Sequence, residues 1–277
     1  MTLSSLTEAL SVTQDRIFFL VGFVVQGWED AKVFVEAASE TNSNIILQAG
    51  PAFRNNMHLE AIAKMFETLA KDTNVKVVAH LDHADNLEIC RQALDVGFTS
   101  VMFDGSKLSL QNNIDKTAKV CDIAKKYGAS VEAELGFVGY ENKDLNKFTC
   151  PKEVRMMTEQ VPIDALAISI GNTHLQSTYS AAIDYKLLAE IRAVSNIPLV
   201  IHGGSGVSPN DRTRMAREFG VVKFNIGTEF RLLFGRSLRD FFAEEKETFD
   251  RFEIMKSVQE NIKKKAISVL QTAKRFK

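Results

Sequence analysis

The feature that most constrains the fold of this 277-residue chain is a repeated alternation of short apolar runs with longer amphipathic segments. The apolar runs are β-branched or continuously apolar, which is typical of buried parallel strands. They cover Phe18–Val25, Asn44–Gln48, Lys76–His80, Ser100–Phe103, Ser130–Glu134, Ala165–Ser169, Ile197–Ile201 and Val221–Ile226. Segments with helical spacing follow them at Glu29–Glu40, Leu59–Lys71, Asn86–Asp95, Asn112–Tyr127, Lys152–Glu159, Tyr185–Val194, Asn210–Phe219 and Glu229–Phe242.

This order of strands and helices predicts a parallel sheet with right-handed crossovers. In a chain of 277 residues, eight such units fit a closed (β/α)₈ barrel better than the alternative, an open doubly wound sheet. A last amphipathic segment, Phe252–Phe276, extends beyond the eighth unit and is expected to pack across the barrel or against another subunit. No linker or break in composition divides the chain, so residues 1–277 are interpreted as a single domain.

Composition argues against several classes of partner. The net charge is −1, so the chain has no global field to gather nucleic acid or an anionic membrane. The longest apolar stretch, Ile17–Val25, is far too short to span a bilayer, and the first residues lack the pattern of a signal peptide. Cys90, Cys121 and Cys150 stand at wide spacings, which predicts reduced thiols in a cytoplasmic protein.

Histidines gather where the predicted strands end. Four of the five histidines, His80, His83, His174 and His202, fall at the ends of three strands. In an α/β barrel these ends share one face, where ligands bind. Three imidazoles with an open position suit Zn²⁺ or a similar metal, so the sequence predicts a site of His83, His174 and His202, with His80 behind them. The alternative is that each histidine is only a hydrogen-bonded group at the barrel rim.

Carboxylates lie on the same predicted rim. Glu134 ends the fifth strand and is either a fourth or alternative metal ligand or a partner that orients one. Asp82 adjoins His83, where a carboxylate can move a proton to or from a metal-polarised substrate, or serve as a structural hydrogen-bond acceptor. Asp104 and Ser106 follow the fourth strand and either bind substrate hydroxyls or cap the next helix.

A glycine-rich segment, HGGSGV, begins at His202 and follows the seventh strand. Glycines allow backbone N–H groups to approach an anion, and the phosphate site of many barrels lies after strands seven and eight. Ser205 and Thr228 can supply hydroxyl donors beside Asn225 of the next strand. The sequence therefore predicts phosphate binding here, although a glycine-rich turn taken alone is often only a turn.

With these residues in view, the chain resembles the class II, metal-dependent ketose-bisphosphate aldolases, in particular the fructose- and tagatose-1,6-bisphosphate branch. The resemblance runs from Leu6 to about Arg231. Its strongest segments are HLDHADNLEICRQALDVGFTSVMFDGSKL, SVEAELG, IPLVIHGGSGV and KFNIGTEFR. It implies a single barrel that reversibly cleaves a ketose 1,6-bisphosphate to dihydroxyacetone phosphate and an aldehyde, and that forms a homodimer or homotetramer.

The resemblance also implies roles at the metal end of the site. His83, His174 and His202 would bind a catalytic zinc ion, with Glu134 nearby. Asp82 would be the general acid/base at the C4 hydroxyl of the substrate. Zinc would take the place of the Schiff-base lysine that the other aldolase class uses.

At the phosphate end, the resemblance implies that Gly203, Ser205 and Thr228 hold the phosphate of the dihydroxyacetone-phosphate half. Asn225 would contact the enediolate. Gly171 begins the backbone cradle after the sixth strand, and a monovalent cation often accompanies the phosphate site in this family.

Several positions depart from the family pattern. Leu175 stands where a glycine usually follows the histidine, and Gly50 stands where a serine is usual. Val24 lies in a turn that usually contains asparagine, and Gly227 replaces an aspartate or asparagine.

The loop after the fifth strand carries a further departure. The family's glutamate that exchanges a proton at C3 is expected at Asn142, with Glu141 one residue earlier. Glu141 is therefore predicted to take that role. Together the departures leave two alternatives: an aldolase for a different sugar or sugar-acid phosphate, or a catalytically weak relative with a binding role.

Overall fold

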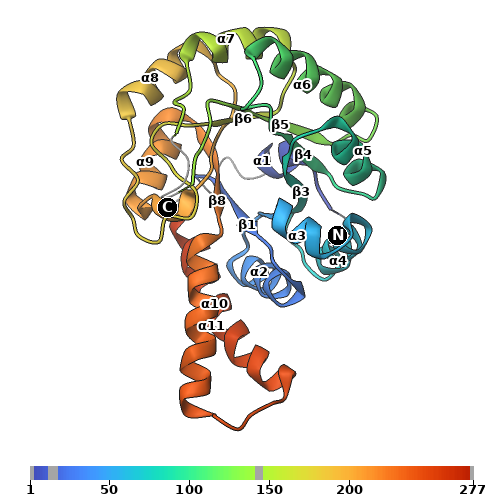
Figure 1. The fold of residues 1–277 in the computed structure, drawn as a ribbon, viewed down its shortest axis with the longest axis vertical. Coiled ribbons are helices and arrows are strands. Elements are labelled where there is room, and N and C mark those ends of the chain that lie inside the picture. Colours follow the sequence, from blue (N-terminus) through green and yellow to red (C-terminus); the bar gives the residue numbers. More distant parts are fainter. Residues whose placement is uncertain (1–2, 12–17, 141–145, 275–277) are drawn as a thin grey trace.

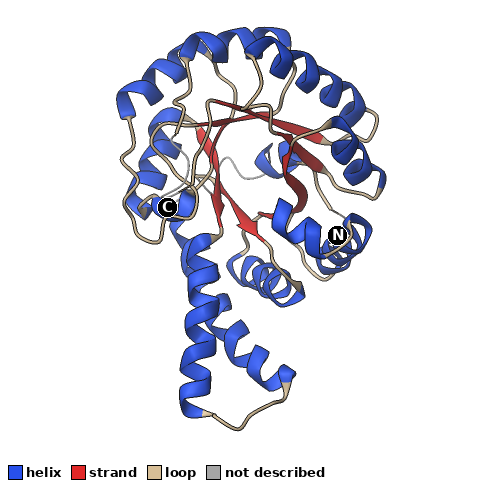
Figure 2. Cartoon of the chain, in the orientation of Figure 1, coloured by secondary structure: helices blue, strands red, loops and turns tan. Residues whose placement is uncertain are grey.

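The structure is a computed structural model that describes residues 3–11, 18–140 and 146–274, and it confirms the closed barrel (Figures 1 and 2). The strands are all parallel and pair in chain order, and β1 pairs with β8. That last pairing closes the sheet, so an open doubly wound sheet is excluded. The strands are β1 (Leu20–Val24), β2 (Ile45–Ala49), β3 (Val77–Ala84), β4 (Ser100–Phe103), β5 (Ser130–Leu135), β6 (Ala165–Ile168), β7 (Leu199–Ile201) and β8 (Val221–Ile226).

Helices form a ring around the strands because each carries one apolar stripe that packs on the sheet. In α4, for example, Ile62, Phe66 and Leu69 are buried on that stripe. Asn86 and Ser109 start α5 and α6 with side-chain caps that accept backbone N–H groups. The ring comprises α2 (Trp28–Thr41), α3 (Pro51–Asn56), α4 (Leu59–Lys71), α5 (Leu87–Asp95), α6 (Leu110–Lys125), α7 (Pro151–Gln160), α8 (Tyr185–Val194) and α9 (Pro209–Phe219).

A short helix, α1 (Leu6–Ser11), covers the N-terminal end of the barrel. Leu6 and Ala9 pack there against inward-facing apolar residues of five strands: Leu20, Ile46, Val78, Ala165, Ala167 and Val200. The backbone N–H of Ser4 donates to the carbonyl of Val77 at 2.9 Å. This end of the barrel is filled with apolar side chains, which leaves the opposite end for chemistry.

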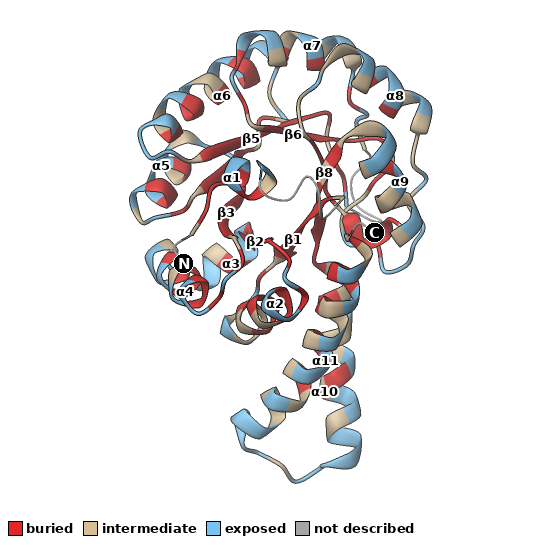
Figure 3. Cartoon of the chain, turned by 180° about the vertical axis from the view of Figure 1, so that it is seen from behind, coloured by how far each residue is buried: buried red, intermediate tan, exposed pale blue. Residues whose placement is uncertain are grey.

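The last two helices, α10 (Thr228–Glu244) and α11 (Arg251–Thr272), form an antiparallel arm that projects away from the barrel (Figure 1). α11 returns along the arm and packs against α2. The outer end of the arm is exposed, while the strands are buried (Figure 3). The predicted segment Phe252–Phe276 is thus largely helical and packs across the barrel's outer side. Its last two residues lie outside the described residues.

The largest boundary difference concerns the strand that carries the histidines. The sequence predicts Lys76–His80, whereas β3 continues through His83 to Ala84. Polar residues predict the end of a strand, but Asp82 and His83 lie within β3 and line a cavity. Helix α3, which begins at Pro51 directly after β2, was not predicted from the sequence. Among the described residues, no helix is both long and apolar enough to cross a membrane.

Candidate active site

A cavity of about 310 Å³ opens at the C-terminal ends of the strands. It brings together residues that are far apart in the sequence, including Asp82, His83, His174, Gly203, Ser205, Asn225 and Thr228. The four departing positions that the structure describes, Val24, Gly50, Leu175 and Gly227, line the same cavity. Glu134 lies deeper, behind the histidines, and Gly171 packs outside the cavity against Ala182. Glu141 and Asn142 lie outside the described residues.

The three histidines come from three separate segments and face one another. Their ring centroids are 4.7 Å apart for His83 and His202, 5.3 Å for His83 and His174, and 5.7 Å for His174 and His202. One nitrogen from each ring lies within 4.8 Å of the other two. The sequence thus predicted correctly that the strand ends gather these three imidazoles.

Three buried atoms at the centre of this cluster make no hydrogen bond within the described part of the chain. His83 Nε2, His202 Nδ1 and Glu134 Oε2 are buried and have no hydrogen-bond partner among the described residues. Buried polar atoms without partners are costly, so such a group needs an explanation. Nitrogen and oxygen atoms that converge in this way fit a divalent cation, which accepts their lone pairs. Glu134 Oε2 is 3.4 Å from His202 Nδ1 and 3.9 Å from His83 Nδ1.

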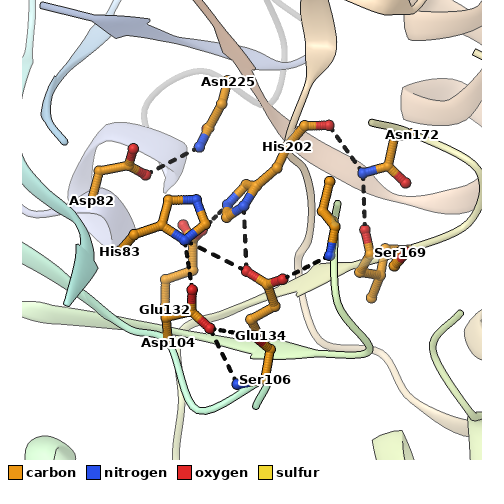
Figure 4. A network of polar contacts seen from close by, with 12 residues as sticks. Asp82, His83, Asp104, Ser106, Glu132, Glu134, Ser169, Asn172, His202 and Asn225 are labelled. Carbon is orange, nitrogen blue, oxygen red and sulfur yellow. Dashed lines mark hydrogen bonds and ion pairs between the residues drawn. The ribbon is translucent and has the colours of Figure 1, made fainter. Parts of the chain in front are cut away.

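Carboxylates hold the other nitrogen of two of these rings (Figure 4). His83 Nδ1 is 2.8 Å from Asp104 Oδ2, and His202 Nε2 is 3.0 Å from Glu132 Oε1. A carboxylate on the far nitrogen fixes the ring's orientation and strengthens the free nitrogen as a metal ligand. Ser106 in turn donates to Asp104 through its hydroxyl and its backbone N–H. Asp104 and Ser106 therefore orient His83 in this structure.

A buried charge network lies beneath the histidines. Lys223 Nζ is 2.7 Å from Glu132 Oε2 and 3.2 Å from His80 Nε2. His80 Nδ1 is 2.8 Å from Ser100 Oγ, and burial together with the charge of Lys223 lowers the pKa of His80 to about 3. His80 is therefore neutral, and both of its nitrogens are engaged behind the cluster.

His202 is held between two carboxylates. Burial disfavours its charged form, but the hydrogen bond to Glu132 and the nearby Glu134 raise the pKa of His202 to about 10. A metal-bound imidazole must lose its proton, so metal binding here would release one. Without a metal, the protonated ring of His202 balances the negative charges of Glu132 and Glu134. With a metal bound, the ion would provide that positive charge instead.

Asp82 lines the cavity and is held by two amides. Its Oδ1 accepts hydrogen bonds from Gln48 Nε2 at 3.0 Å and from Asn225 Nδ2 at 3.3 Å. Burial favours the neutral acid, but the positive charges of His83, His202 and Lys223 outweigh it and lower the pKa of Asp82. Asp82 is therefore ionised near neutral pH and can act as a base.

The backbone at His83 is in the left-handed region, with φ of 51°. Arg54 on α3 holds this conformation by donating to the carbonyls of Ala49, Asp82 and His83 at 2.9, 2.5 and 3.1 Å. Left-handed backbone in a residue with a side chain costs free energy and persists only where its surroundings enforce it. Arg54 provides that enforcement.

The glycine-rich turn is shaped by close backbone contacts. Gly203 has φ of 63°, and a Cβ there would lie 2.2 Å from the carbonyl oxygen of Thr173. Residues Gly204–Gly206 form a short 3₁₀ turn, η1, directly after β7 and His202. Ser205 Oγ accepts from the backbone N–H groups of Gly227 and Glu229, both at 3.3 Å. Its hydroxyl proton remains available to donate to an anion in the cavity.

Two of the departing positions pack against each other. A Cβ on Gly227 would lie 2.9 Å from both Cβ and Cγ2 of Val24, so a side chain after β8 would require β1 to move. Leu175, which stands where the family usually has glycine, has φ of 60°. Glycine adopts this left-handed conformation without cost, whereas in leucine it is strained.

Several residues of the site were not predicted from the sequence. Glu132 and Lys223 are charges inside otherwise apolar strands, and that pattern could have identified them as a buried pair. Tyr140, whose ring stacks on His174 with centroids 5.0 Å apart, and Arg231, which lines the cavity from α10, had no such signal. Arg54 was missed because α3 itself was not predicted.

A closed parallel barrel with histidines and carboxylates at the C-terminal ends of its strands is a TIM-barrel enzyme in architecture. Residues 4–275 match the family model described as fructose-bisphosphate aldolase class-II. The chain therefore belongs to the class II fructose-bisphosphate aldolase family and is an aldolase, a carbon–carbon lyase.

Individual relatives agree with this assignment. The fructose-bisphosphate aldolase of Staphylococcus aureus strain Mu50 is 34% identical over 270 residues, covering 95% of this chain and 94% of that protein. The enzyme of the same name from Staphylococcus epidermidis strain RP62A is 32% identical over the same share. The structure of the YdjI aldolase from Escherichia coli K12 superposes with a TM-score of 0.85 at 26% identity, covering 98% of this chain and 97% of that one.

Proposed function

We propose that this aldolase is zinc-dependent and reversibly cleaves a ketose 1,6-bisphosphate of the fructose or tagatose type to dihydroxyacetone phosphate and an aldehyde. The observation that carries the proposal is the cluster of buried atoms without hydrogen-bond partners among the described residues, on His83, His202 and Glu134. Two of the three histidines, His83 and His174, line one cavity together with Asp82 and the glycine-rich turn. Metal-binding, proton-transfer and anion-binding groups are thus combined in one place.

At the metal end, His83, His174 and His202 would hold the ion, and Glu134 would be a fourth or alternative ligand. Bound zinc would polarise the ketose carbonyl and stabilise the negative charge that develops when the C3–C4 bond breaks. Asp104 and Glu132 keep two of the imidazoles oriented through their far nitrogens. This orientation supports the assignment because metal-bound histidines are commonly held in this way.

Asp82 would act as the base that removes the proton of the C4 hydroxyl in cleavage and returns it in condensation. Gln48 and Asn225 both donate to its Oδ1, so Oδ2 is the oxygen left to take the proton. The same amide of Asn225 would contact the enediolate. For the proton at C3 we propose Glu141, which lies outside the described residues.

The phosphate of the dihydroxyacetone-phosphate half would lie on Gly203, Ser205 and Thr228. Thr228 is the first residue of α10, where the helix dipole favours an anion. Gly171 would contribute through the backbone cradle after β6, with a monovalent cation beside it. A second anionic group at the far end of the substrate would fit Arg231, which lines the same cavity.

The proposal is tested with purified protein and a panel of ketose phosphates. Release of dihydroxyacetone phosphate is measured from fructose and tagatose 1,6-bisphosphates, together with the metal content of the protein. We expect about one zinc ion per chain and cleavage of at least one of the two substrates. Bound zinc without cleavage of any ketose phosphate would instead support a relative with a binding role.

A specific observation favours a second candidate, an aldolase for a different sugar or sugar-acid phosphate. Val24, Gly50, Leu175 and Gly227 alter the cavity wall while the histidine cluster is intact. The panel therefore includes longer ketose 1-phosphates and sugar-acid phosphates. Faster cleavage of one of these than of both bisphosphates would favour the second candidate.

We further propose a homodimer or homotetramer of one-domain chains in the cytoplasm. The projecting arm supports self-association because Phe249 and Phe252 at its outer end are 93% and 85% exposed. The packing of α11 on α2 supports a single domain over residues 1–277. Cys90, Cys121 and Cys150 are all free, which agrees with a reducing compartment.

A further inference from the structure

The glycine-rich turn is held from behind by a buried arginine. Arg212 on α9 is 1% exposed and donates to the carbonyl oxygen of Gly204 from Nε at 3.0 Å and from Nη2 at 2.7 Å. Gly204 has no room for a side chain, because a Cβ would lie 2.8 Å from the carbonyl oxygen of Asn225. The turn therefore depends on Arg212 for the position of this carbonyl.

The arginine is connected to the phosphate end of the site through Glu229. Arg212 Nη2 is 3.1 Å from Glu229 Oε1, and Glu229 lies in the first turn of α10. The backbone N–H of Glu229 donates to Ser205 Oγ, the hydroxyl that faces the cavity. Displacement of Glu229 would thus move both the turn and its serine.

The same glutamate reaches the C-terminal helix. Glu229 Oε2 is 2.7 Å from Lys265 Nζ on α11. Buried charges are tolerated when they are paired, and removal of one partner leaves the other uncompensated. Lys265, Glu229 and Arg212 form a continuous path from α11 to the carbonyl of Gly204, and none of the three lines the active-site cavity.

We propose that Arg212, Glu229 and Lys265 are positioning residues for the phosphate site, and that helix α11 sets the affinity for phosphorylated substrate through them. This inference rests on the proposed function, because it assigns the turn to phosphate. The network touches neither the histidine cluster nor Asp82. Its loss should therefore weaken substrate binding and leave the chemical step unchanged.

The test compares full-length wild-type protein with Lys265→Met, Glu229→Gln and Arg212→Met. Lys264→Met, an exposed neighbour on α11, is the matched control. Binding of inorganic phosphate is measured by calorimetry, and kcat and KM are measured for the ketose phosphate that the wild type cleaves. We expect phosphate affinity to fall about 10-fold in Arg212→Met and less in Lys265→Met, with KM rising in parallel and kcat within about 2-fold.

The outcomes separate this inference from the proposed function. Equal phosphate affinity in wild type and all three variants would overturn the inference and leave the aldolase site intact. A wild type that binds no phosphate would overturn the phosphate site and, with it, the inference. A drop in kcat at constant KM would also overturn it. Arg212→Met removes a buried charge and could fail to fold. In that case the phosphate affinities of Lys265→Met, at a half-buried position, and of the isosteric Glu229→Gln decide the result.

Discussion

Asp82 shows how a single residue of this site derives its chemistry from its neighbours. Its carboxylate is buried, which alone would favour the neutral acid. Three positively charged groups lower its pKa, and two amides bind one of its oxygens. The result is an ionised carboxylate with one oxygen held by two amides, which fits the proposed role of Asp82 as a base.

Replacement of Asp82 by asparagine tests that role. Asp82→Asn keeps the shape and an oxygen for Gln48 but cannot take a proton. We expect kcat for ketose phosphate cleavage to fall about 10²- to 10⁴-fold. Zinc content should stay at the wild-type level, because the imidazole cluster is untouched. A variant that retains the wild-type kcat would show that another group moves the C4 proton.

Leu175 is strained, and the strain predicts a stabilising substitution. Its φ of 60° places the side chain in a conformation that only glycine adopts without cost. We expect Leu175→Gly to raise the free energy of unfolding by about 0.5–1 kcal/mol, measured by urea denaturation. Leu175→Ala is the control and should give no such gain, because it keeps the Cβ. Equal behaviour of the two variants would contradict the assignment of strain.

At the scale of elements, much of the site could be predicted because it depends on where strands end. His83 lies in β3, His202 directly follows β7, and His174 lies in the loop after β6, so all three reach the one face where parallel strands of a barrel end. Contacts that run between elements could not be predicted. The contact of Asp104 with His83 joins the adjacent segments β3 and β4, whereas Glu132 on β5 reaches His202 after β7, with β6 between them. Both contacts depend on side-chain directions, which the sequence does not encode by spacing.

Helix α3 illustrates this limit and yields a prediction. Arg54 fixes three carbonyls around His83, so Arg54→Met should release the left-handed conformation there. We expect zinc affinity to fall about 10- to 100-fold in a competition titration with a chelator. Arg91→Met, at an exposed position on α5, should bind zinc as the wild type does. Unchanged zinc affinity in Arg54→Met would show that His83 holds its conformation unaided.

At the scale of the whole molecule, the sequence predicted the number and order of the strand–helix units but not the shape of the C-terminal segment. Its amphipathic spacing is equally compatible with packing on its own barrel and on another subunit. The structure shows the first of these, with α11 against α2, and leaves the outer end of the arm exposed. Spacing alone cannot separate the two arrangements, because packing on the chain's own barrel and packing on another subunit would bury the same apolar stripe of the helix. The tertiary contacts decide between them.

The exposed end of the arm predicts an effect on assembly. Phe249→Ser combined with Phe252→Ser removes the two most exposed large apolar side chains among the described residues. We expect sedimentation velocity to show a shift from an oligomer to a monomer, with the barrel still folded. Tyr179→Ser, at another exposed aromatic position, should leave the oligomer intact. An unchanged sedimentation coefficient in the double variant would place the subunit interface elsewhere.

The central claim is that the chain's aldolase chemistry depends on a metal held by His83, His174 and His202. The most direct test is to strip the protein with a chelator, remove the chelator, and assay ketose-bisphosphate cleavage before and after zinc is restored. We predict that cleavage disappears with the metal and returns at about one zinc ion per chain, and that His83→Ala neither binds this zinc nor recovers. Cleavage that survives complete removal of metal would contradict the account.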